Sequence, residues 1–109
     1  MTKQSCITVL DQRVQLLQTA GGFRTSIDSV LLAAACPAKA GDHVLDMGCG
    51  VGSAGLCVLW RVPEAKLTGV EIQQESAELA AQNAALNGMA DQCAFIQSDI
   101  RVFRGLGFN

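Results

Sequence analysis

Residues 44–56 read VLDMGCGVGSAGL, and this stretch is the strongest indication of the fold class. The apolar run HVLDM, which ends at Met47, is typical of a short buried β-strand. Four glycines within the next eight residues, GCGVGSAG, exclude regular structure there. From Ser53 to the residue before Pro63, the sequence is typical of a helix. We therefore expect a strand, a glycine-rich loop and a helix in direct succession.

The residues that follow repeat this alternation. KLTGVEI at 66–72 predicts a second strand, and CAFIQ at 93–97 predicts a third. Between them, QQESAELAAQNAALNG at 73–88 predicts a helix with Leu79 and Leu86 on one apolar face. Strands that alternate with helices at this spacing favour a parallel sheet with right-handed crossovers, which is a Rossmann-like α/β fold.

The N-terminal part has a different pattern. CITVL and RVQLLQ, on either side of the polar pair at 11–12, predict a short β-hairpin. Ser26 and Asp28 are helix-start residues before an apolar run that Pro37 limits. We expect one domain, because 109 residues leave no room for two cores, with a hairpin-and-helix part at 1–40 and the Rossmann-like part at 41–109.

Composition restricts the class of protein. With 50% hydrophobic and 17% charged residues and a net charge of −2, the chain is expected to fold rather than stay disordered. No apolar run reaches the length of a membrane span and the N-terminus lacks a signal-peptide core, so we expect a cytoplasmic protein with no membrane partner. None of the five cysteines forms a C-x-x-C pair, so no metal site is expected.

Three acidic residues stand where the predicted strands end: Asp46, Glu71 and Asp99. Ligands of open parallel sheets bind beyond the carboxyl ends of the strands, so these carboxylates are candidate ligand contacts. The glycines Gly50-x-Gly52-x-x-Gly55 match the dinucleotide-binding fingerprint, with Glu71 about 20 residues further on. A nicotinamide dinucleotide is therefore one candidate ligand.

The charge pattern favours a different ligand. A carboxylate at Asp46, two residues before the first glycine, would repel a pyrophosphate. S-adenosylmethionine has no phosphate and carries an ammonium and a sulfonium group, which Asp46 would attract. Glu71 would then accept hydrogen bonds from the ribose hydroxyls, and Asp99 one from the adenine amino group. S-adenosylmethionine is the cofactor that this pattern predicts.

These motifs resemble those of a known family. VLDMGCGVGSAGL, GVEIQ and SDI are similar to the cofactor motifs of class I S-adenosylmethionine-dependent methyltransferases. GFRTSIDSVLLAAACP at 22–37 and the stretch 61–88 resemble the bacterial "small-domain" methyltransferases, which include the valine-tRNA adenine-N6 methyltransferase. The resemblance covers roughly residues 12–100 and implies a three-layer α/β/α methyltransferase fold.

The resemblance also implies site residues and an acceptor. The segment with Phe23 is expected to fold over the cofactor as a lid. The expected cofactor contacts are Arg24, Ser26, Asp28, Asp46, Gly48, Cys49, Gly50, Gly52, Glu71, Ile72, Asp99 and Ile100. Cys49 is expected to contribute backbone rather than a reactive sulfur. The implied acceptor is the exocyclic amino nitrogen of adenine in tRNA, with rRNA, protein and small molecules left open.

One family motif is not in the sequence. Members that methylate an amino nitrogen resemble one another in an Asn/Asp-Pro-Pro-aromatic loop after the fourth strand, whereas Pro37 and Pro63 are the only prolines here. We therefore expect the cofactor-binding part of a longer enzyme, truncated after the third core strand, with no catalytic residue assigned. The strand at 44–47 would then have an exposed edge, through which we expect the chain to dimerise or aggregate. A dinucleotide-binding domain and a non-catalytic binding module stay open as alternatives.

Overall fold

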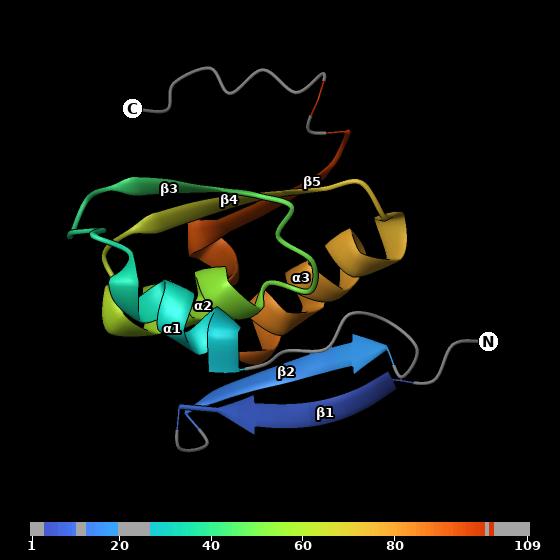
Figure 1. The fold of residues 1–109 in the computed structure, drawn as a ribbon, viewed down its shortest axis with the longest axis horizontal. Coiled ribbons are helices and arrows are strands. Elements are labelled where there is room, and N and C mark those ends of the chain that lie inside the picture. Colours follow the sequence, from blue (N-terminus) through green and yellow to red (C-terminus); the bar gives the residue numbers. More distant parts are fainter. Residues whose placement is uncertain (1–3, 11–12, 20–26, 100, 102–109) are drawn as a thin grey trace.

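A three-stranded parallel sheet positions the candidate site (Figure 1). The computed structural model describes residues 4–10, 13–19, 27–99 and 101. The strand order is β3-β4-β5, with bounds His43–Met47, Lys66–Glu71 and Cys93–Gln97. The central strand β4 is buried along its length except at Lys66, as expected of a strand paired on both sides. The predicted parallel sheet is confirmed, and β3 and β5 have the predicted bounds.

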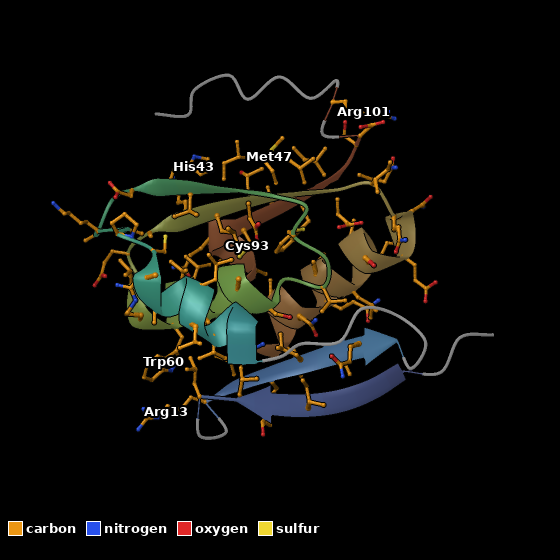
Figure 2. The ribbon with its side chains drawn as sticks, in the orientation of Figure 1. Arg13, His43, Met47, Trp60, Cys93 and Arg101 are labelled. Atoms are coloured by element: carbon orange, nitrogen blue, oxygen red, sulfur yellow. The ribbon has the colours of Figure 1, made fainter. Side chains whose placement is uncertain are left out.

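The helices lie together on one face of this sheet (Figure 1). They are α1 (Ile27–Ala35), α2 (Ser53–Arg61) and α3 (Gln74–Leu86), with a short 3-10 turn η1 at Ala90–Gln92 before β5. His43 and Met47 point to the opposite face (Figure 2), where Met47 is 42% exposed. The described residues thus form the sheet and one helix layer of the predicted three-layer fold. None of their helices is long and apolar enough to cross a membrane.

The N-terminal hairpin covers the helix layer on the side away from the sheet (Figure 1). Its strands β1 (Gln4–Val9) and β2 (Val14–Thr19) pair antiparallel, as predicted. Val14 and Leu16 of β2 are fully buried in one core cluster with Leu56 of α2. The hairpin therefore contributes apolar side chains to the core of the Rossmann-like part.

A side chain of α2 forms hydrogen bonds with the end of α1. Arg61, in the last turn of α2, donates hydrogen bonds from Nη2 to the carbonyl oxygens of Ala33 (3.1 Å) and Cys36 (2.5 Å). Carbonyl groups at the end of a helix have no partner within the helix, and a cation there also interacts favourably with the helix dipole. These bonds add to the apolar contact of Ala33 with Cys57 and Val58 in the core.

One sequence prediction about α3 is wrong. Leu79 is buried, but Leu86, predicted to share its apolar face, is 45% exposed. Asn83 in α3 and Asn87, the residue directly after its end, instead form side-chain hydrogen bonds with β2. At the C-terminal end of α3, the side that is buried is therefore the one that contacts the hairpin, and not the one that carries Leu86.

Candidate cofactor site

The loop between β3 and α2 is built on glycines with left-handed backbone conformations. Gly48, Gly50 and Gly52 have φ angles of 83°, 56° and 90°. Residues with a Cβ rarely adopt such angles, so an alternating series of them explains the glycine spacing. Gly55 has a different role, because a Cβ there would lie 2.6 Å from Cδ2 of Leu67. Its lack of a side chain lets α2 approach β4 closely.

Backbone and side-chain hydrogen bonds attach this loop to the end of β4. The amides of Gly48 and Cys49 both donate to the carbonyl oxygen of Val70, at 2.7 and 3.0 Å. The amide of Gly50 donates to Oε1 of Glu71 at 3.0 Å, and the amide of Gln73 donates to Oε2 at 2.9 Å. The structure therefore brings together the loop and Glu71, two of the elements that the sequence assigned to one site.

Asp46 gives this site its electrostatic character. Its side chain is partly buried, and no described residue donates a hydrogen bond to its carboxylate. Burial, and next the negative charge of Glu71, raise the pKa of Asp46 above the usual Asp range. A half-buried carboxylate beside a second carboxylate is a favourable environment for a cation and an unfavourable one for an anion.

Cys49 lies in the same anionic environment. Burial, followed by the charges of Asp46 and Glu71, raises the pKa of the Cys49 thiol to about 12. The thiol therefore stays protonated at neutral pH and is a poor nucleophile. The prediction that Cys49 contributes through its backbone agrees with this environment, although no ligand contact tests it.

Asp99 lies at the same edge of the sheet but has a partner. The amide of Ser98 donates to the carbonyl oxygen of Glu71 at 3.0 Å, which holds the segment after β5 beside the end of β4. Both carboxylate oxygens of Asp99 accept hydrogen bonds from the exposed Arg101 guanidinium, at 2.6 to 3.0 Å. These bonds lower the pKa of Asp99, so this carboxylate is ionised at neutral pH. Ile72, directly after Glu71, is 55% exposed at this edge.

The remaining predicted contacts are not placed. Phe23, Arg24, Ser26 and Ile100 lie outside the described residues, and for Asp28 only the backbone, in α1, is described. Within the part of the chain that is described, no group of three or more His, Cys, Asp or Glu side chains could hold a metal ion.

A pocket of about 400 Å³ opens beside Asp46, between α1, β3 and α2. Its walls are apolar, and Asp46 is the charged residue among those that line it; the others include Leu32, Pro37, Val44, Ala54 and Val58. An apolar pocket with one carboxylate is suited to a ligand that joins a cationic group to apolar surface.

One residue of the site was not predicted. The buried side chain of Asn83 on α3 donates a hydrogen bond from Nδ2 to the carbonyl oxygen of Val51 in the glycine loop, at 2.9 Å. In the sequence, the only sign of this contact is a polar residue on the side of an Ala-rich helix that carries Ala80 and Ala84.

Comparison with known proteins identifies the family of the chain. Residues 14–103 match the family described as methyltransferase small domain. A curated relative, the tRNA1(Val) (adenine(37)-N6)-methyltransferase of Yersinia enterocolitica, is 37% identical over 82 residues, which cover 74% of this chain and 33% of the relative. The protein of the same name in Porphyromonas gingivalis is 37% identical over 93 residues, covering 82% and 36%. The chain spans about a third of the length of these relatives.

Solved structures agree on the fold. Pyrococcus horikoshii TYW2, crystallised with MeSAdo, superposes with a TM-score of 0.80 at 20% identity, over 96% of this chain and 39% of that one. A S-adenosylmethionine-dependent methyltransferase from Geobacter sulfurreducens, crystallised with S-adenosyl-L-homocysteine, gives 0.65 at 27% identity, over 75% and 32%. The Rossmann-like fold is therefore confirmed. The chain belongs to the methyltransferase small domain family.

Proposed function

We propose that this chain binds S-adenosylmethionine and forms the cofactor site of a methyltransferase that acts on an adenine amino nitrogen of tRNA. The observation that carries the proposal is the partly buried carboxylate of Asp46, which accepts no hydrogen bond from the described residues and lies close enough to Glu71 for their charges to interact. When bound, the cofactor supplies a methyl group on a positively charged sulfur. The roles of the protein's own residues follow from their positions.

Asp46 accepts hydrogen bonds from the ammonium group of the cofactor. Burial, and next the charge of Glu71, raise the pKa of Asp46, and the nearby positive charge of the ammonium group offsets both effects, so binding favours the ionised carboxylate. A nicotinamide dinucleotide would instead bring a pyrophosphate toward two carboxylates. The same pair of acidic residues thus favours one ligand and disfavours the other.

Glu71 holds the loop and the ribose at once. Its two oxygens already accept hydrogen bonds from the amides of Gly50 and Gln73. A carboxylate has about four acceptor positions, so two are left for the ribose hydroxyls. Glu71 therefore holds the glycine loop against the end of β4 in the ligand-free protein.

Ile72 and Asp99 would hold the adenine part of the cofactor. Ile72 would contribute its exposed apolar side chain, and Asp99, held by Arg101, would accept a hydrogen bond from the adenine amino group. The backbone of Gly48, Cys49, Gly50 and Gly52 would contact the methionine part. Arg24, Ser26, Asp28 and Ile100 complete the proposed contacts on the basis of the family resemblance.

The acceptor is proposed from the relatives. The curated relatives carry the name of a tRNA adenine-N6 methyltransferase, at 32% to 37% identity with this chain. The 109 residues contain no Asn/Asp-Pro-Pro-aromatic motif, so no residue of this chain is assigned to hold the target amino group.

Radiolabelled S-adenosylmethionine tests both parts of the proposal. In equilibrium dialysis, we expect the chain to retain the label, and we expect S-adenosylhomocysteine but not NADH to displace it. With unfractionated tRNA, rRNA and protein offered as acceptors, any label that is transferred should be found in N6-methyladenosine of tRNA. Label in another acceptor would refute the tRNA assignment. Bound cofactor with no transfer to any acceptor would refute turnover by this chain and favour a non-catalytic binding module.

A further inference from the structure

Two asparagines, Asn83 in α3 and Asn87 directly after its end, form hydrogen bonds with the edge of the N-terminal hairpin. The amide of Leu17 donates to Oδ1 of Asn83 at 2.6 Å, and Nδ2 of Asn83 donates back to the Leu17 carbonyl at 2.9 Å. One helical turn later, Asn87 makes the same pair of bonds with Gln15, at 2.8 and 2.6 Å. Four residues of helix advance about 6 Å, close to the advance of two residues in a strand, so both side chains are in register with β2.

The two asparagines differ in their third hydrogen bond. Nδ2 of Asn83 also donates to the carbonyl oxygen of Val51, in the glycine loop, whereas Nδ2 of Asn87 donates to the carbonyl oxygen of Asn83 itself. Asn83 is completely buried, and both of its amide hydrogens and its oxygen are engaged. Among the described residues, the Asn87 side chain therefore forms hydrogen bonds with β2 and α3, while that of Asn83 also forms one with the loop.

We infer that Asn83 is a positioning residue for the glycine loop, which it holds in the cofactor-binding conformation while it attaches β2 to the same point of α3. Val51 lies between Gly50 and Gly52, both of which have left-handed backbone angles. Such a loop has many accessible conformations unless hydrogen bonds restrict it. Glu71 holds the amide of Gly50 from the side of the sheet, and Asn83 holds the carbonyl of Val51 from the side of the helix.

The expected effect of Asn83 on cofactor binding rests on the proposed function, whereas its hydrogen bond to the loop does not. Loss of one neutral hydrogen bond to a loop costs about 0.5 to 1.5 kcal/mol, which corresponds to a change in affinity of about 2- to 12-fold. Replacing either asparagine removes its two hydrogen bonds to the hairpin, which should lower the stability of the fold in both variants. Replacing Asn83 alone also removes the bond to Val51, so the two variants form a matched comparison.

Asn83→Ala and Asn87→Ala are the two variants to compare. We expect both to lower the urea midpoint. Asn83→Ala should also weaken S-adenosylhomocysteine binding about 2- to 12-fold and should accelerate hydrogen exchange of the Gly50 and Gly52 amides in the ligand-free protein. Asn87→Ala should change neither by more than about 2-fold. Equal effects of the two variants on affinity and on loop exchange would overturn the inference.

The wild-type protein provides a test that does not depend on folding of the variants. The side-chain amide signals of Asn83 should shift in ¹⁵N–¹H spectra when S-adenosylhomocysteine is added, and those of Asn87 should not. Unchanged Asn83 signals at saturating ligand would overturn the inference. Failure of the wild-type protein to bind the ligand would refute the proposed function instead, and loop exchange in ligand-free Asn83→Ala would still test the positioning role.

Discussion

Replacing Gly69 by alanine should destabilise the protein through the glycine loop. Gly69 lies in the middle of β4, paired with Asp46 on one side and Phe95 on the other. A Cβ added there would lie 2.7 Å from Sγ of Cys49 and 2.7 Å from Cδ1 of Phe95. Ordinary contacts begin at 3.4 Å, so these groups would have to move by about 0.7 Å.

The expected cost follows from this overlap. An extra methyl group in a well-packed core costs about 1 to 3 kcal/mol. Replacing a glycine in a strand interior regains about 0.5 to 1 kcal/mol, so the centres of the two ranges leave a net loss of about 1 kcal/mol, and their extremes a loss of at most about 2.5 kcal/mol. With an m-value of about 1 kcal/mol/M for a chain of this size, the urea midpoint should fall by about 1 M.

A double-mutant cycle with Cys49→Ala identifies the contact responsible. Removal of the sulfur relieves one of the two overlaps, so Gly69→Ala should cost less in the Cys49→Ala background than in the wild type. An unchanged or higher midpoint in Gly69→Ala, or strictly additive effects of the two substitutions, would refute the packing argument.

Three further predictions concern charge, reactivity and assembly. Because the pKa of Asp46 is raised, the folded state binds its proton more tightly than the unfolded state does, and stability falls as pH rises from the usual Asp range through the raised pKa. Asp46→Asn should therefore raise the urea midpoint at pH 7, and this gain should disappear at acidic pH, where Asp46 is protonated in both states; no gain at pH 7 would contradict the burial argument. Exposed Cys6 should react with a thiol reagent at pH 8 far faster than Cys49, whose pKa is about 12, and comparable rates measured by mass spectrometry would contradict that environment. Since β3 pairs only with β4 among the described strands, light scattering should find dimers or larger species, and a clean monomer at high concentration would exclude association through this edge.

The sequence predicts the order of elements well where the local pattern is strong. The apolar runs HVLDM and CAFIQ give the bounds of β3 and β5, and Ser53 marks the start of α2, because glycines or polar residues lie directly beside each run. The meeting of Asp46 and Glu71 was also predictable. The carboxyl ends of neighbouring parallel strands lie at one edge of the sheet, and the register pairs Asp46 with Gly69, two residues before Glu71.

Contacts between distant segments were not predictable in this way. Leu86 is exposed and Asn83 is buried because the hairpin covers the side of the helix that carries Asn83. Leu17 of the hairpin, which forms a hydrogen bond with Asn83, is 66 residues away from it in the sequence. A hydrophobic pattern predicts that the leucine is buried. An asparagine can be buried as well when its side-chain amide forms hydrogen bonds with the backbone N–H and C=O groups at a free strand edge.

We propose that Asp46 selects a cationic cofactor, and calorimetric titration with S-adenosylhomocysteine is the experiment for this proposal. This ligand retains the ammonium group, and a charge-assisted hydrogen bond contributes about 1.5 to 3 kcal/mol, so Asp46→Asn should weaken binding about 13- to 160-fold. We expect saturable binding by the wild-type chain, this loss in the folded variant, and no heat of binding with NADH. Equal affinity of wild type and variant, or binding of NADH in place of S-adenosylhomocysteine, would contradict it.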